Sequence, residues 1–283
     1  MNTFRADLHC HTTCSDGTKT PEEIVRMAKE IGLAGLSITD HDSIEAYSFI
    51  VPLAKELGIS LISGVEFSTV HNGVSVHILG YSFPLDSPLI NAFCEKHRLR
   101  RLDRNQMILE RLAARKMPIT QAELEACLHQ AHPGMKNTIG RPHIAQALIQ
   151  KGYVSSIQEA FNKYLGDNKS CYAPGQSFST QETIDLIHGA KGLAVIAHPH
   201  LVNDIPTLRA LMKLNFDGIE CFYAKFPLIQ QKPWLEIAQK HNWLVTGGSD
   251  YHGTIKPNLN LGSSFVQEEA FCLLEQHFIK NNP

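Results

Sequence analysis

Imidazole and carboxylate side chains gather close to the start of the chain, in the segment Asp7-Leu8-His9-Cys10-His11. In an extended strand alternate side chains share a face, so we expect Asp7, His9 and His11 to point one way. Cys10 is expected to point the other way, into the core, which removes it from the set of potential ligands. Two imidazoles then converge on one point as candidate metal ligands.

Similar side chains recur along the chain, at or just past the ends of apolar runs that have the composition of strands. Asp16 joins them from a small polar turn that can fold its carboxylate back over the end of the first strand. A single histidine in such a place usually has a structural role, but the recurrence of the pattern favours a metal site. The candidate ligands are His9, His11, Asp16, His41, Glu66, His77, His198, Asp250 and His252.

Ligand chemistry limits which ions this set could bind. Neutral imidazoles and carboxylates without cysteine favour borderline or moderately hard divalent ions, so we expect Mn²⁺, with Zn²⁺ or Fe²⁺ as alternatives. Glu66 could bridge two ions, and the set could complete two or three sites with positions left open for water. The 7 cysteines are scattered and form no CxxC pair, which argues against a disulfide framework or a thiolate zinc site.

The framework that positions these residues is predicted to alternate strands with helices. Thr20-Pro21-Glu22-Glu23 combines an N-cap, a proline and a capping-box glutamate, and predicts a helix that ends near Gly32. A strand over residues 35–39 and a helix over residues 44–57 repeat this order. About seven such strands indicate a parallel α/β sheet. A barrel gathers all strand ends on one face, whereas an open sheet would spread them, so the sequence favours a barrel.

Residues 87–180 break this alternation. Helices are predicted there without strands: a long one from Leu89 to about Lys116, and shorter ones that begin at the cap residues Thr120 and Ser156 and after Pro142. We therefore expect a helical insertion that binds substrate. The predicted division is residues 1–86 for the first part of the barrel, 87–180 for the insertion and 181–283 for the second part.

Charge and hydropathy exclude several kinds of partner. The 283 residues include 26 basic and 28 acidic ones, so no overall field attracts nucleic acid or membrane, and an anionic partner must be met by local clusters. No apolar stretch reaches the ~20 residues that span a bilayer. The first residues lack the layout of a signal peptide. We expect a cytoplasmic protein with no membrane contact and no obligate protein partner.

Five short motifs carry a resemblance to a known family. They are Asp7-Leu8-His9-Cys10-His11-Thr12, Thr39-Asp40-His41-Asp42, Glu66, Ala197-His198-Pro199 and Ser249-Asp250-Tyr251-His252. In this order they resemble the successive motifs of the PHP (polymerase and histidinol phosphatase) superfamily. The resemblance covers both sides of the predicted insertion. It implies a distorted (β/α)7 barrel, a trinuclear metal centre at the C-terminal ends of the strands, and hydrolysis of phosphate esters.

The resemblance also implies a role for each candidate ligand by its motif position. Many PHP proteins have histidine where Asp16 stands. Asp7 would lie behind the ligands as an acceptor for an imidazole N–H. The residues expected to be catalytic are His9, His11, Asp250 and His252. The three groups of ligands would be His9, His11, Glu66 and Asp250; Asp16, His41 and His252; and His77, His198 and Glu66.

Cationic side chains for the phosphate oxygens are predicted in the insertion. Arg101 and Arg104 are three residues apart on one helix face, although this spacing alone fits a solvated basic face equally well. An Arg-x-x-Arg-Asn helix and a Gly-Arg-x-His segment resemble the 3′,5′-nucleoside bisphosphate phosphatases, a group associated with 5′ to 3′ trimming of short RNA. The substrate-binding residues implied are Arg101, Arg104, Asn105, Arg141 and His143.

The expected function is that of a metal-dependent phosphoesterase. It would release phosphate from nucleoside 3′,5′-bisphosphates and trim short RNA from the 5′ end, with metal-activated hydroxide attacking phosphorus. The alternatives are a histidinol-phosphate or other small phosphomonoester phosphatase, and a non-catalytic metal-binding module. The paired arginines favour the first function, because a second phosphate needs a second anionic anchor. Tyr153, Phe161 and Tyr172 could stack on a base, although core packing is the simpler explanation.

Overall fold

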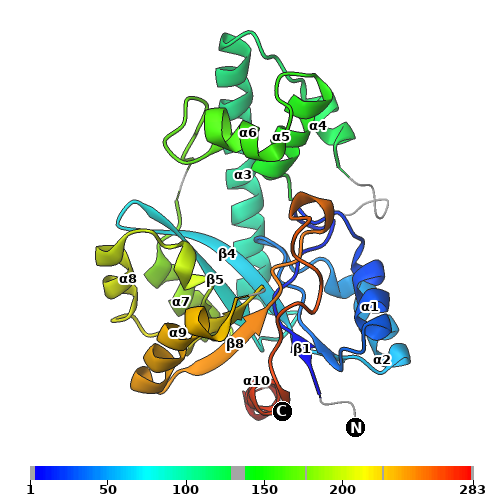
Figure 1. Ribbon diagram of the computed structural model, residues 1–283, viewed down its shortest axis with the longest axis vertical. Coiled ribbons are helices and arrows are strands. Elements are labelled where there is room, and N and C mark those ends of the chain that lie inside the picture. The colour runs from blue at the N-terminus through cyan, green and yellow to red at the C-terminus, as the bar shows by residue number, and fades with distance from the viewer. Residues whose placement is uncertain (1–3, 129–137, 176, 225, 282–283) are drawn as a thin grey trace.

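The computed structural model describes residues 4–128, 138–175, 177–224 and 226–281. Two β-sheets with flanking helices form its lower part in Figure 1, and one long helix leads from them to a group of shorter helices. Mixed α/β architecture is therefore confirmed. Among the described residues, no helix is both long enough and apolar enough to cross a membrane.

The first sheet holds the N-terminal strands. Its order is β1 (Ala6–Asp7), β2 (Gly35–Leu36) and β3 (Ser60–Leu61), all parallel. The helices between these strands are α1 (Pro21–Glu30) and α2 (Tyr47–Leu57). The predicted capping box is present, because Thr20 Oγ1 accepts the backbone N–H of Glu23 and the Glu23 carboxylate accepts that of Thr20.

The second sheet has the order β4 (Gly64–His71), β5 (Val74–Tyr81), β6 (Leu193–Ile196), β7 (Gly218–Tyr223) and β8 (Leu244–Gly248). Strands β6, β7 and β8 are parallel, but β5 is antiparallel to both β4 and β6. The prediction of an all-parallel sheet was therefore wrong at this point. The reason is the two-residue turn Asn72-Gly73, where both φ angles are positive, because such a turn closes an antiparallel hairpin.

Single bridges join the edges of the two sheets. On one side the backbone N–H of Leu8 donates to Gly247 O at 3.2 Å, and that of Asp250 donates to His9 O at 2.7 Å. On the other side, the N–H of Asp42 donates to Glu66 O at 2.9 Å. The segments that follow β1 and β8 are thus held side by side, and the segment that follows β2 is held beside β4, so that their polar residues meet at one end of the sheets.

The remaining helices fall into two groups. Packed around the sheets are α7 (Thr180–Gly189), α8 (Ile205–Leu211), α9 (Leu228–His241) and α10 (Glu268–Asn281). The second group consists of α3 (Pro88–Ala114), α4 (Gln121–Ala126), α5 (Arg141–Gln150), α6 (Ile157–Ala160) and the single turn η1 (Phe161–Leu165). No strand occurs among the described residues of the second group, as predicted.

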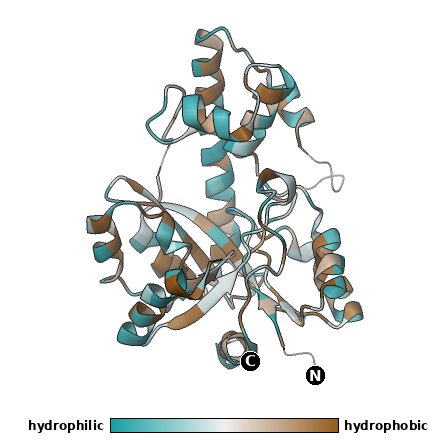
Figure 2. Ribbon diagram, in the orientation of Figure 1, coloured by the Kyte–Doolittle hydropathy of each residue, from teal (hydrophilic) through white to brown (hydrophobic). Residues whose placement is uncertain are grey.

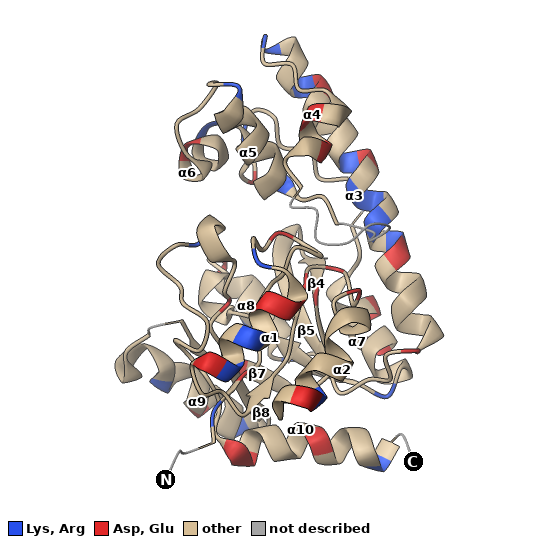
Figure 3. Cartoon of the chain, turned by 90° about the vertical axis from the view of Figure 1, so that its right-hand side faces the viewer, with Lys and Arg blue, Asp and Glu red and all other residues tan. Residues whose placement is uncertain are grey.

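Helix α3 belongs to two hydrophobic cores. Ile90 and Phe93 near its start pack with the second sheet, whereas Ile108 and Leu112 near its end pack with the shorter helices of the second group. Its middle is hydrophilic in Figure 2 and contains a cluster of Lys and Arg residues, blue in Figure 3. The charged stretch therefore lies at the junction of the two cores, over the end of the sheets where the polar residues meet.

Candidate metal centre and adjoining pocket

The segment after β1 brings the first two histidines to the end of the sheets. Leu8 and Cys10 are fully buried in two different core clusters, so they anchor this segment, and His9 and His11 turn to the opposite side. The predicted alternation is confirmed, and Cys10 lies outside the cluster of ligand-type side chains.

His9 and His11 face a pair of buried carboxylates. The Nε2 atom of His9 lies 3.4 Å from Glu66 Oε2 and 3.5 Å from Asp250 Oδ1. The Nε2 atom of His11 lies 3.1 and 3.4 Å from the same two oxygens. Neither Nε2 atom makes a hydrogen bond, although both are buried. Four ligand-type atoms therefore converge on one small volume.

Asp16 forms a second convergence with three imidazoles. Its carboxylate oxygens lie 3.6 Å from His11 Nδ1, 3.8 Å from His41 Nε2 and 3.4 Å from His252 Nε2. Burial raises the pKa of Asp16, but His41 and His252 outweigh this effect and hold it well below its usual range. The Asp16 carboxylate therefore faces three imidazole nitrogens and could share a cation with them.

Glu66 connects this cluster to the last two histidines. Its Oε1 atom lies 2.8 Å from His77 Nδ1 and 2.7 Å from His198 Nε2, whereas its Oε2 atom faces His9, His11 and His41. Burial raises the pKa of Glu66, and the surrounding histidines, His41 first, lower it well below its ordinary value. The structure thus brings all nine predicted ligand-type residues together, with Glu66 in the middle.

The donor set fits divalent cations. Carboxylate oxygens and imidazole nitrogens within 4.8 Å of one another form four overlapping groups, and each group offers three or four donors. A ring nitrogen that is buried in the protein interior without a hydrogen bond costs free energy. A bound cation offsets this cost, because the nitrogen lone pair coordinates it. The absence of cysteine from these groups agrees with ions that prefer nitrogen and oxygen ligands.

Two of these residues occupy strained backbone positions. The φ angle is +25° at His198, directly after β6, and +50° at Asp250, just after β8. Side chains other than glycine rarely adopt such angles, and the strain is usually found where a side chain must point in a defined direction. Both residues leave the ends of their strands sharply, which turns their side chains toward Glu66 and His9.

Glu220 is part of this arrangement, and the sequence analysis missed it. It lies on β7, where its Oε1 atom is 2.8 Å from His9 Nδ1 and its Oε2 atom accepts the backbone N–H of His198. The sequence does contain one sign of Glu220, a lone carboxylate inside the apolar run Gly218–Tyr223. Burying an unpaired charge costs free energy, so a carboxylate in a buried strand is expected to have a partner.

The expected role of Asp7 was wrong. Its carboxylate accepts the backbone N–H groups of His9, Ser249 and Gly262 and contacts no imidazole nitrogen of the described residues. Asp7 therefore fixes the backbone between β1 and β8, and Glu220 is the carboxylate that faces the outer nitrogen of His9.

A pocket of about 490 Å³ opens beside the cluster. Asp16, His41 and His77 line one side of it. The opposite side is lined by four arginines from the helical group, Arg100, Arg101, Arg104 and Arg141. The pocket thus places a concentration of positive charge next to the candidate metal centre, which is the arrangement that a phosphate ester requires.

Arg104 is the least satisfied of the four arginines. Its side chain is buried, and its Nε and one terminal nitrogen make no hydrogen bond within the described chain. Burial lowers the pKa of its guanidinium well below the usual value, and the neighbouring Arg101 and Arg141 lower it further. A buried cation that has cationic neighbours and forms no ion pair with the described residues indicates a site for an anion.

Comparison with known proteins agrees with this site. The PHP domain family matches residues 7–191, more than half of the chain. The chain belongs to the PHP domain family. A 5′-3′ exoribonuclease, Rnm, from Escherichia coli is 34% identical over 256 residues, which cover 87% of this chain and 84% of that protein. A 3′,5′-nucleoside bisphosphate phosphatase from Chromobacterium violaceum is 31% identical over 253 residues, 87% of this chain and 86% of its own length.

A solved PHP-like structure has the same architecture. The crystal structure of a metal-dependent phosphoesterase from Bifidobacterium adolescentis superposes with a TM-score of 0.86 at 34% identity, and the match covers 96% of each chain. The resemblance stated from the motifs is confirmed, and so is the expected class of activity. This PHP protein is a metal-dependent phosphoesterase, a hydrolase of phosphoric esters.

The remaining predicted substrate residues differ in what they contact. Asn105 donates its amide to Ile139 O at 2.9 Å, and His143 Nδ1 accepts the backbone N–H of Gly140 at 3.0 Å. Among the described residues, neither of them lines the arginine pocket. Arg141 does line it, and pairs with Asp167 at 2.7 Å. In this PHP protein Asn105 and His143 therefore shape the start of α5, whereas Arg141 lies in the pocket wall, where Asp167 holds it.

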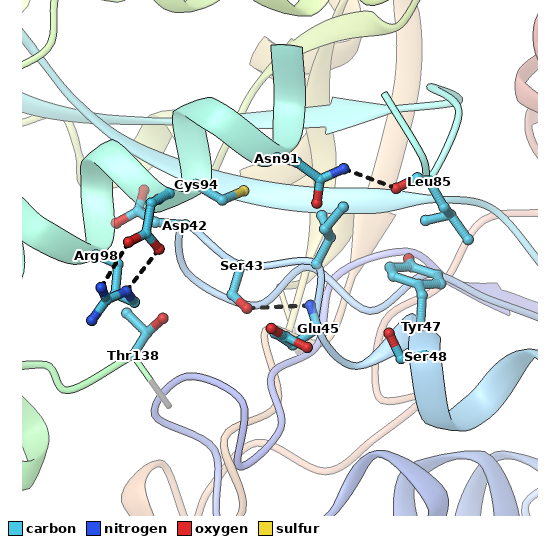
Figure 4. A pocket seen from close by; sticks show the side chains of 12 residues that line it. Asp42, Ser43, Glu45, Tyr47, Ser48, Leu85, Asn91, Cys94, Arg98 and Thr138 are labelled. Carbon is cyan, nitrogen blue, oxygen red and sulfur yellow. Dashed lines mark hydrogen bonds and ion pairs between the residues drawn. The ribbon is translucent and has the colours of Figure 1, made fainter. Parts of the chain in front are cut away.

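Arg101 is tied to the buried carboxylate of Asp42. Its Nε donates to Asp42 Oδ2 at 2.7 Å, and His97 Nδ1 lies 3.0 Å from Asp42 Oδ1. Asp42 also borders a separate cavity of about 370 Å³, shown in Figure 4, where Arg98 pairs with Glu95. The pair Asp42–Arg101 thus forms a wall between this cavity and the arginine pocket.

Proposed function

We propose that the nine clustered side chains bind two or three divalent ions, Mn²⁺ in the first place, with Zn²⁺ or Fe²⁺ as alternatives. The support is the set of buried nitrogens without hydrogen bonds on His9, His11 and His41, which lie 3.1 to 3.4 Å from one oxygen of Glu66. The three groups of ligands follow the division that the PHP motifs imply, with Glu66 shared between two of them.

We propose nucleoside 3′,5′-bisphosphates as substrates, together with short RNA that carries a 5′-phosphate. The observation that carries this proposal is the buried Arg104, whose Nε and one terminal nitrogen find no hydrogen-bond partner in the described part of the chain, in a pocket that is also lined by His41 and His77. A substrate with two anionic groups can place one at the metal centre and the other at the arginines. The names of the two relatives, an exoribonuclease and a bisphosphate phosphatase, agree with such a substrate.

Both reactions can break the same bond, between phosphorus and the 3′-oxygen of the first nucleoside. Bound divalent ions would supply Lewis acidity and a water molecule of lowered pKa. The chain itself would orient the substrate: Arg104 and Arg141 would hold the 5′-phosphate, so that the 3′-linked phosphate reaches the nine clustered side chains. Among the catalytic residues that we propose, His9, His11, Asp250 and His252, the carboxylate of Asp250 is fixed by Tyr223.

We also propose that the two sheets act as one distorted (β/α)7 barrel, and that residues 87–180 are an insertion that supplies substrate contacts. The single bridges between the sheets support the first point. The separate hydrophobic core around Ile108 and Leu148 supports the second. In this arrangement the barrel contributes the candidate metal ligands, and the insertion contributes the arginines.

The test compares three substrates in the presence of Mn²⁺: adenosine 3′,5′-bisphosphate, histidinol phosphate and a short 5′-phosphorylated RNA. We expect phosphate release from the first and nucleotide release from the third. Activity on histidinol phosphate alone would replace our proposal by the phosphomonoesterase alternative. The variants His9→Ala and Asp250→Ala should lose both bound metal and activity; unchanged metal content in both would contradict the ligand assignment.

A further inference from the structure

A second cavity adjoins the candidate metal centre at His77 and His198. Its volume is about 520 Å³, and His77 and His198 form its inner wall. It shares five lining residues with the arginine pocket, namely Val74, Ser75, His77, Asp167 and Asn168. The two cavities therefore meet at these residues, beside His77 of the candidate metal centre.

The second cavity differs from the arginine pocket in charge. No lysine or arginine is among its described lining residues, which instead include the carboxylates of Asp167 and Asp204 and the amides of Asn168 and Asn203. Asp204 caps α8 by accepting the backbone N–H of Thr207 at 2.7 Å. Hydrogen bonds from the side chain and the backbone of Thr207 lower the pKa of Asp204. Asp167 also lines the arginine pocket, where it pairs with Arg141, so Asp204 is the carboxylate that distinguishes the second cavity. A phosphate group meets no cationic side chain among the described lining residues, whereas a neutral group with hydrogen-bonding edges would be accepted.

The outer rim of the cavity is apolar. Leu201 lines it and is 52% exposed, and the nearby Ile205 is 62% exposed. Large exposed apolar side chains beside a polar cavity suit a flat, partly apolar ligand such as a nucleobase. The volume lies within the range of about 300–1,000 Å³ that small-molecule sites usually have.

We propose that this cavity binds the second nucleoside of an oligonucleotide substrate. The inference rests on the proposed function, because it takes the first nucleotide to be held by the arginines. The phosphate under attack then lies between the two cavities, at His77. The amides of Asn168 and Asn203 face the sugar and base edge of the second nucleoside, and Leu201 covers its base.

The reaction balances with this placement. Water contributes a hydroxide that forms a new bond to phosphorus, and the bond from phosphorus to the first 3′-oxygen breaks. That oxygen takes up the proton and leaves as a 3′-hydroxyl. The phosphate remains on the 5′-oxygen of the second nucleoside, which becomes the new 5′-phosphorylated end. With a bisphosphate the same bond breaks, and the second cavity is not used.

The test measures kcat/KM with Mn²⁺ for two substrates, adenosine 3′,5′-bisphosphate and the 5′-phosphorylated dinucleotide pApA. In the variant Leu201→Asp, the ratio of pApA to bisphosphate turnover should fall about tenfold, mainly through KM. The matched control is Leu273→Asp on α10, where the leucine is 46% exposed and lines none of the cavities described above. This variant should leave the ratio as in the unmodified protein.

The difference in charge between the two substrates separates the loss of a nucleoside contact from general charge repulsion. The bisphosphate carries more negative charge than pApA, so general repulsion by a new carboxylate would reduce bisphosphate turnover more and would raise the ratio. An unchanged or raised ratio in Leu201→Asp overturns the inference. Turnover of bisphosphate without any cleavage of pApA overturns it as well, but leaves the phosphatase proposal intact. Failure on both substrates refutes the proposed function, and the inference with it.

Discussion

The Nδ1 atom of His9 lies 2.8 Å from Oε1 of Glu220, and both side chains are buried. The other oxygen of Glu220 accepts the backbone N–H of His198 at 2.7 Å. A carboxylate at Nδ1 favours the tautomer that carries its proton there, which leaves Nε2 of His9 free to bind a cation. One carboxylate thus orients two residues that we propose as ligands of different ions.

Replacing Glu220 should therefore weaken metal binding without removing a ligand. In Glu220→Gln the shape is kept but the charge is lost, and we expect the affinity for Mn²⁺ to fall about 10- to 100-fold. The measurement is metal content after dialysis against buffers of fixed free Mn²⁺, with circular dichroism to confirm folding. Equal metal affinity in the variant and the unmodified protein would leave Glu220 with a purely structural role.

The candidate ligands could be predicted because their signal is local. His9 and His11 follow β1 two residues apart, and Asp250 and His252 follow β8 with the same spacing, so each pair could be recognised from a short stretch of sequence at the end of an apolar run. The contact between His9 and Glu220 joins residues 211 positions apart and depends on how β7 pairs with β8. No local pattern encodes that pairing, and the same holds for the contact between Arg101 and Asp42.

Gly248 sets the distance between β8 and the segment that carries the first ligands. A Cβ atom at this position would lie 2.3 Å from His9 N and 2.5 Å from His9 Cβ. Gly248→Ala should displace His9, lower the free energy of unfolding by about 1–3 kcal/mol and reduce bound metal. Urea unfolding and metal analysis measure both effects.

Gly189→Ala is a suitable control for this variant. Its Cβ would meet only one atom, Leu89 Cδ1, at 3.4 Å, so it should unfold at the same or higher urea concentration and keep its metal. Normal metal content in Gly248→Ala would show that β8 can shift without disturbing the candidate metal ligands.

Replacing Arg104 should weaken substrate binding without lowering the stability of the protein. In Arg104→Met a buried, unpaired charge is removed from beside Arg101 and Arg141, so the melting temperature without substrate should stay equal or rise. Because a charged hydrogen-bonding partner of the substrate is lost, KM for adenosine 3′,5′-bisphosphate should rise at least about tenfold. Metal content should not change. A lower melting temperature together with lost metal would indicate that Arg104 supports the fold instead.

The pH dependence of stability should contain a contribution from His188, which lies on α7 and is not one of the candidate ligands. Its Nε2 atom is 2.7 Å from Asp217 Oδ2, and this hydrogen bond raises the pKa of His188 above its ordinary value of 6.5. The protonated form is therefore favoured in the folded state. The resulting stabilisation is complete below pH 6.5 and is lost as the pH rises through the pKa of the folded state.

His188→Gln tests this contribution, because glutamine does not titrate. The two side chains are 27% and 30% exposed, so solvent screening limits the effect to about 0.5–1 kcal/mol. We expect the variant to lose that amount of unfolding free energy at pH 5.5 and much less at pH 9, as measured by urea unfolding. A loss of equal size at both pH values would mean that His188 stabilises the protein through packing and not through its charge.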